Sequence, residues 1–168
     1  MFTTVNDRHP KFNHGEMIEQ IMVDFSDAEE NGLRIALGDE MMDKVLRGCN
    51  FHFMQSAMRM AKLVTETEAQ QDMFVRIAKR ISNCNDQNEV RMYFDVLGGR
   101  RPVEDVADFF ENQNLREKAK EVRNDSWKGA KTWLEWWLRP KHLAKCSSAF
   151  SGKLLANVFF SFFMSKIF

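Results

Sequence analysis

The sequence has 168 residues, about one domain in size, and its 44% hydrophobic content is enough to build a core and to exclude a wholly disordered chain. Basic and acidic residues number 24 each, so there is no net charge and no general excess of cations for binding nucleic acid. An odd count of three cysteines and a polar start without an apolar signal segment predict a nuclear or cytoplasmic protein that is not secreted.

The first elements predicted along the chain are an irregular segment, a strand and a helix. Residues 1–16 show no periodicity and predict an irregular N-terminal segment. The apolar run Ile21–Val23 predicts a short buried strand with Asp24 at its carboxyl end. Ser26 is a good N-cap for a helix, and Gly38 marks where that helix should end.

A second strand and a second helix are predicted next. After a polar link over 39–43, Lys44–Cys49 has the composition of a short strand, and Phe51–Val64 has the apolar spacing of a helix. Strand, helix, strand, helix with short links predicts neighbouring parallel strands joined by a right-handed crossover.

From residue 65 onward the pattern is helical only. Apolar spacing predicts helices over 65–82 and 88–97, a third that opens at Pro102, and a long fourth over 115–138 with a break near Asp125 or Gly129. The fold class expected from the residues is therefore α+β, mostly helical.

The last stretch, Leu154–Phe168, is rich in phenylalanine and almost uncharged. It is shorter than a membrane span, so no membrane partner is expected. Two interpretations stay open: an apolar surface helix, or residues read from a wrong frame or an intron.

Asp24 is the first candidate for a chemical role. Open α/β sheets place their active sites at the carboxyl ends of parallel strands, and Mg²⁺ takes oxygen ligands such as carboxylates. The alternative is that Asp24 only helps to cap the helix that begins at Ser26, and the local pattern by itself favours this capping role.

Cys49 and His52 have the spacing of half a zinc site, but zinc takes four ligands. His142 and Cys146, four residues apart, are the candidate completion. Spacing alone favours a buried cysteine and a histidine at a helix start, so zinc is not expected.

A third candidate is an aromatic and basic segment near the end of the helical region. Its side chains could stack on bases and hold phosphates, although tryptophans at helical spacing more often pack in a core. The segment comprises Trp133, Trp136, Trp137, Arg139, Lys141 and His142.

In order along the chain, Ile21-Met-Val-Asp-Phe-Ser-Asp-Ala-Glu-Glu-Asn and Gly48-Cys-Asn-Phe-His-Phe-Met-Gln-Ser resemble the middle of a Mutator-like element transposase. In that family a strand ending in Asp-Phe-Glu precedes a helix, and a Cys-x-x-His-Phe segment opens the next helix. The later Trp133-Leu-Glu-Trp-Trp-Leu-Arg-Pro-Lys-His-Leu resembles the tryptophan-rich helix of animal members. The similarity covers roughly residues 17–150.

The resemblance implies a partial RNase H-like fold over 17–64, with two short parallel strands and helices, and an all-helical insertion over 65–150. The irregular segment 1–16 and an aberrant hydrophobic tail at 151–168 flank these parts. It also implies that Asp24 is the second acid of an Asp-Asp-Glu triad that binds Mg²⁺ for DNA strand cleavage and transfer. Cys49 and His52 match the Cys-x-x-His pair of the family.

Two of the three triad acids have no counterpart in the sequence. Asp7 follows no apolar run and is a poor first aspartate, and the phenylalanine-rich tail stands where the glutamate should lie. We therefore expect an inactive fragment or remnant of a transposase, unless another subunit supplies two acids. The alternative is a co-opted, non-catalytic module that binds DNA or protein. DNA is the partner implied by the resemblance, and an incomplete sheet with a hydrophobic edge favours self-association.

Overall fold

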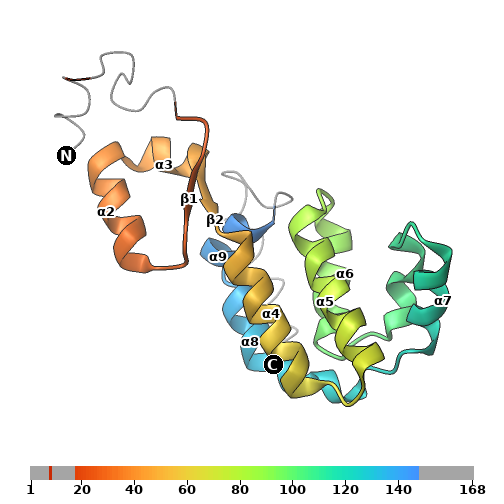
Figure 1. Cartoon of the computed structure of the whole chain (residues 1–168). Helices are drawn as coiled ribbons and strands as arrows, with labels where there is room; N and C mark the ends of the chain where they lie inside the picture. Colours follow the sequence, from red (N-terminus) through yellow and green to blue (C-terminus); the bar gives the residue numbers. More distant parts are fainter. Residues whose placement is uncertain (1–7, 9–17, 148–168) are drawn as a thin grey trace. The chain divides into compact units, whose positions relative to one another are not determined.

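The computed structural model describes residue 8 and residues 18–147, and these fall into two compact units that meet in the sequence between Cys49 and Asn50. We call residues 18–49 the αβ unit and residues 50–147 the helical unit (Figure 1). The expected boundary after residue 64 differs from this division, because the helix over 50–64 packs on the helices that follow it. The expected segments 1–16 and 151–168 lie outside the described residues, except for residue 8.

The αβ unit contains the two predicted strands, and they are parallel. β1 (Ile21–Val23) pairs with β2 (Leu46–Gly48), with Ile21 opposite Leu46 and Val23 opposite Gly48. The coarse prediction of a mostly helical chain with two short parallel strands is thus confirmed. The second strand is three residues long, shorter than the predicted run of six.

The helix α2 (Asp27–Leu37) begins and ends where the sequence predicts. The Ser26 hydroxyl oxygen accepts a hydrogen bond from the amide of Glu29 over 3.4 Å, which satisfies one of the free amides of the first turn. Gly38 ends the helix with a φ of +84°, a backbone conformation that residues other than glycine rarely adopt.

The polar link predicted over 39–43 is wrong, because these residues belong to helix α3 (Asp39–Val45). Acidic residues in its first turn interact favourably with the positive end of the helix dipole. Met42 and Val45 are buried on one face of this short helix. With Val23 and Leu46 they form the core of the αβ unit. The helix was missed because its two buried side chains are too few to show a periodic pattern.

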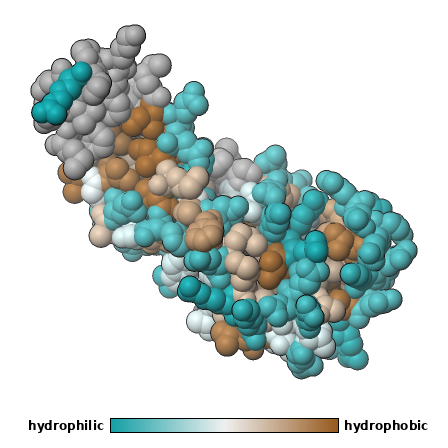
Figure 2. All heavy atoms as spheres, in the orientation of Figure 1, coloured by the Kyte–Doolittle hydropathy of each residue, from teal (hydrophilic) through white to brown (hydrophobic). Residues whose placement is uncertain are grey.

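Part of the αβ unit's apolar surface remains exposed. Met22 is 60% exposed and Ile35 is 88% exposed, and hydrophobic side chains gather over this unit in Figure 2. The visible face of the helical unit is mostly hydrophilic by comparison.

The helical unit is built from α-helices and two 3₁₀ helices around a core of its own. The predicted helices over 51–64, 65–82 and 88–97 are present, with ends shifted by up to three residues. Thr67 caps the second of them, with its side chain accepting from the amide of Gln70. The elements are α4 (Asn50–Val64), α5 (Glu68–Asn83), α6 (Gln87–Leu97), the 3₁₀ helix η2 (Val103–Phe109), α7 (Gln113–Glu121), the 3₁₀ helix η3 (Asp125–Ala130), α8 (Lys131–Trp137) and α9 (Pro140–Cys146).

The long helix predicted over 115–138 is divided into α7, η3 and α8, and the break lies at residues 122–124, just before the predicted position at Asp125. Asn124 explains the break. Its buried side-chain amide donates hydrogen bonds of 2.8 Å to the carbonyl oxygens of Val96 and Arg101, so the chain must turn inward there. Two backbone acceptors from a distant turn are satisfied in this way, at the expense of helix continuity.

The turn that receives Asn124 contains Gly99, whose φ is +64°. A Cβ atom at this position would lie 2.9 Å from Cγ of Lys128 and 3.0 Å from the carbonyl oxygen of Asn124. Both the backbone conformation and the close approach therefore require glycine. Within the described part of the chain, no helix is long and apolar enough to cross a bilayer.

Candidate functional site

Asp24 and Cys49 follow the two strands of the αβ unit at the same edge of the sheet. The amide of Cys49 donates to the carbonyl oxygen of Val23 over 2.8 Å, which continues the parallel pairing past Gly48. Asp24 is exposed, and its Oδ1 accepts from the amide of Ser26 over 2.7 Å. The carboxylate thus has a structural task, holding the turn that leads into α2.

Three other carboxylates of the αβ unit converge on Arg34, a cluster that the sequence analysis did not single out. Arg34 lies 3.0 Å from Glu30, 3.2 Å from Asp39 and 2.9 Å from Asp43. Burial opposes the charge of Arg34, but hydrogen bonds to Asp43, Glu30 and Asp39 outweigh it and raise the pKa. The spacing of Glu30 and Arg34 by four residues was the one signal available in the sequence.

This arrangement does not fit a two-metal site. Two Mg²⁺ ions need several converging carboxylates free to act as ligands. Among the described residues no group of three or more histidine, cysteine, aspartate or glutamate side chains is placed to hold a metal ion. The carboxylates that do converge are neutralised by Arg34, and Asp24 is not among them.

The four residues considered for zinc occupy different settings. Cys49 ends the αβ unit and is half-buried, whereas His52 is exposed in the first turn of α4. His142 and Cys146 lie in α9 and are buried. Burial raises the pKa of the Cys146 thiol to about 12, and the thiol donates to the carbonyl oxygen of Leu143 over 3.7 Å. Zinc binds the thiolate, so burial disfavours this ligand.

The tryptophan-rich segment takes part in an aromatic cluster inside the helical unit. Trp136 stacks on His142 with ring centroids 3.7 Å apart, and Trp137 meets Phe53 of α4 edge-on at 4.8 Å. Trp133 donates from Nε1 to the hydroxyl oxygen of Ser56 over 2.7 Å. The rings that were candidates for stacking on bases therefore contact one another, which supports the packing interpretation. The cluster comprises Phe53, Phe74, Trp127, Trp133, Trp136, Trp137 and His142.

The surroundings of His142 disfavour its charged form. Its Nδ1 lies 2.7 Å from the carbonyl oxygen of Trp136, and the residue is 2% exposed. Burial lowers the pKa of His142, and the nearby cations of Lys141, Lys145 and Arg139 lower it further, against the hydrogen bond to Trp136. Of the basic residues predicted for a DNA-binding face, Arg139 and Lys141 are exposed.

A second polar network, also not predicted, joins α5, α6 and η2. Arg80 donates to the hydroxyl of Tyr93 over 3.2 Å and to the carbonyl oxygen of Phe109, while the Tyr93 hydroxyl donates to Glu89. Burial, together with the hydrogen bond to Glu89, raises the pKa of Tyr93. Because Arg80 bonds residues of both other elements, the network serves to fix the helices.

Comparison of the chain with known protein families, with curated proteins and with solved structures finds no match.

Proposed function

We propose that this chain is a fragment or remnant of a Mutator-like Asp-Asp-Glu transposase and does not cut DNA by itself. The observation that carries the proposal is the parallel pair β1–β2, with Asp24 directly after one strand and Cys49 directly after the other. This is the place that the resemblance gives to the second catalytic aspartate and to the Cys-x-x-His pair. The helices that follow α4, from residue 65 onward, then take the place of the family's insertion in a partial RNase H-like fold.

Inactivity follows from the ligand requirement of the reaction. In the complete parent enzyme, Mg²⁺ would activate the attacking water and stabilise the leaving oxygen, with three carboxylates as ligands. Asp24 supplies one carboxylate, and Oδ1 of that carboxylate already accepts from the Ser26 amide. The carboxylates that converge elsewhere in the αβ unit pair with Arg34.

The test has a biochemical and a genetic arm. The purified chain, incubated with supercoiled plasmid and Mg²⁺ or Mn²⁺, is expected to give no nicking above that of an Asp24→Asn variant. Metal-dependent nicking by the wild-type chain that this change abolishes would contradict the proposal. Sequencing of the transcript and of the flanking genomic DNA is expected to reveal a strand ending in aspartate upstream or a glutamate segment downstream. Flanks with neither remnant would overturn the transposase ancestry.

The second candidate is a co-opted interaction module without catalysis. It is favoured by the helical unit, which has an aromatic core that does not depend on the triad acids. If DNA is the partner, the exposed cations Arg139 and Lys141 are its contacts. Replacing both by alanine should then weaken duplex binding in a gel-shift assay, whereas alanines at Lys118 and Lys120 on α7 should not. Equal loss in both pairs would point to nonspecific charge attraction.

A further inference from the structure

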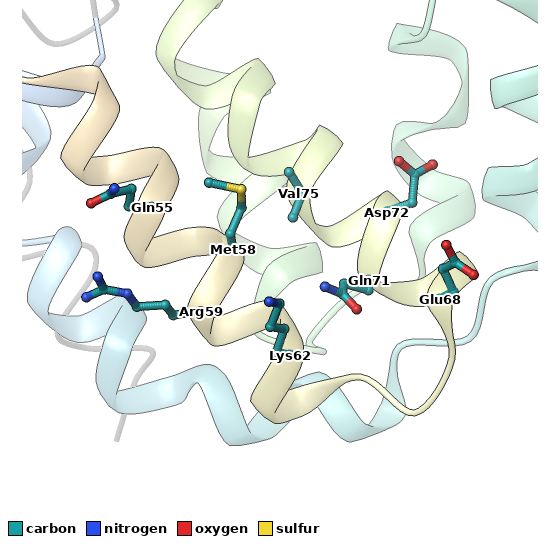
Figure 3. Close-up of a pocket in the computed structure, with 8 residues that line it drawn as sticks. All are labelled: Gln55, Met58, Arg59, Lys62, Glu68, Gln71, Asp72 and Val75. Atoms are coloured by element: carbon teal, nitrogen blue, oxygen red, sulfur yellow. The ribbon is translucent and has the colours of Figure 1, made fainter.

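A groove runs between α4 and α5 on the surface of the helical unit. It is open and encloses about 470 Å³. Figure 3 shows Met58 and Val75 approaching each other across it from the two helices. Met58 is 42% exposed, and Phe51, two turns earlier on the same side of α4, is 63% exposed. The residues lining the groove are Gln55, Met58, Arg59, Lys62, Glu68, Gln71, Asp72 and Val75.

The two walls of the groove carry opposite charges. Arg59 and Lys62 lie on α4, and Glu68 and Asp72 lie on α5, all with exposed side chains. Asp72 pairs with Arg76 on its own helix at 2.8 Å. Within the described part of the chain, Arg59, Lys62 and Glu68 form no ion pair within 4.0 Å. The groove therefore presents a basic wall and an acidic wall beside exposed apolar side chains.

We propose that this groove binds the same groove of a second copy of the chain. A two-fold axis along the groove places α4 of each copy against α5 of the other. Lys62 then meets Glu68 and Asp72 of the second copy, and the contact occurs twice. The exposed Met58 of each copy meets the opposite Val75, which removes apolar surface from water.

The charges on the two walls favour a second copy of the chain over nucleic acid as the binding partner of the groove. A duplex tracking along Arg59 and Lys62 would bring its phosphates beside Glu68 and Asp72, which repel them. A copy of the same groove matches both walls at once, because opposite charges on two neighbouring antiparallel helices are self-complementary under that rotation.

A charge-swap experiment on the full chain tests the dimer. Sedimentation velocity over a dilution series should show a monomer–dimer equilibrium. Lys62→Glu and Glu68→Lys, each alone, place like charges opposite each other twice and should raise the dimer dissociation constant by about tenfold or more. Lys118→Glu on α7, outside the groove, is the matched control and should leave the constant unchanged.

Mixing the two single variants gives the decisive result. In a mixed dimer, the glutamate introduced at position 62 of one copy faces the lysine introduced at position 68 of the other. The second contact keeps its native Lys62 and Glu68, so both contacts are again between opposite charges and association should return to the wild-type level.

Circular dichroism melting of each variant checks that the helical unit is folded. A wild-type chain that stays monomeric, dimers unaffected by either single change, or no recovery on mixing would overturn the proposal. So would duplex DNA that binds the monomer and is released by Lys62→Glu.

Discussion

The amide nitrogen of Cys49 lies 2.8 Å from the carbonyl oxygen of Val23 and donates a hydrogen bond to it. The two strands therefore end at the same edge of the sheet, and Asp24 and Cys49, the residues that follow them, lie at that edge. After Asp24 the chain continues into α2, and after Cys49 it continues into α4.

Two replacements of Asp24 distinguish its role as a hydrogen-bond acceptor for the Ser26 amide from any role of its negative charge. Asp24→Asn keeps an oxygen that can accept from the Ser26 amide and should leave the αβ unit within about 0.5 kcal/mol of wild type, whereas Asp24→Ala should destabilise it by about 1 kcal/mol. Hydrogen exchange of the first amides of α2 measures the difference. Equal losses in the two variants would show that the negative charge, not the acceptor, is what matters.

Replacing Arg34 should destabilise the αβ unit strongly. Arg34→Met leaves Glu30, whose side chain is 11% exposed, without its cation, at a cost of about 1–3 kcal/mol. Adding Glu30→Gln should recover part of this loss, because the buried charge is gone. The control is Lys44→Met, which breaks a pair with Glu40 whose side chains are 67% and 77% exposed and should change stability by less than about 0.5 kcal/mol. Chemical denaturation followed by exchange in α2 and α3 gives the comparison, and equal effects would contradict it.

Gly99→Ala should destabilise the helical unit by about 1–3 kcal/mol, because it forces a positive φ on alanine and brings its Cβ against the Asn124 carbonyl. Gly32→Ala is the contrasting change. Gly32 lies inside α2 with nothing within 4 Å of a new Cβ, so this variant should be stabilised by about 0.5–1 kcal/mol. Thermal melting of both variants is the measurement. A neutral Gly99→Ala would mean that the turn can relax.

The lowered pKa of His142 predicts that acid reduces the stability of the helical unit. Its pKa is lowered in the folded chain, so below the ordinary value near 6.5 the unfolded chain takes up a proton before the folded chain does. The free energy of unfolding should fall as the pH drops from about 7 toward 5. Across this range, the slope of melting temperature against pH should become much smaller in His142→Gln. The slope should stay as in the wild type in His52→Gln, a change at an exposed histidine of α4. An unchanged slope in His142→Gln would assign the acid sensitivity to other groups.

The parts that sequence reasoning predicted are those determined by near neighbours. Ser26 starts a helix by accepting from the amide three residues on, and Gly38 ends that helix through its own φ. The parallel strands followed from two short apolar runs. Each of these features depends on contacts within about one turn of helix or on a simple alternation of burial.

The parts that were missed depend on distant residues. A break near Asp125 was predicted, but not its cause: the side chain of Asn124 bonds Val96, 28 residues away, and Arg101, 23 residues away. Arg34 gathers Asp39 and Asp43 across the turn at Gly38, a geometry that spacing alone does not reveal. The spacing of the tryptophan segment favoured core packing, but it did not reveal that Phe53 of α4 is the packing partner of Trp137.

The hydrogen bond between Trp133 and Ser56 joins residues 77 apart, so during synthesis it can form only after residue 133 has left the ribosome. The hairpin of α4 and α5 is made first, yet Phe53 and Phe74 acquire their tryptophan partners only when residues 127–137 have emerged. A nascent chain paused before Trp127 therefore displays uncovered aromatic surface, which is what chaperones bind. A chain truncated within the last helices of this unit should therefore be bound by chaperones as if α4, the first helix of the unit, were misfolded.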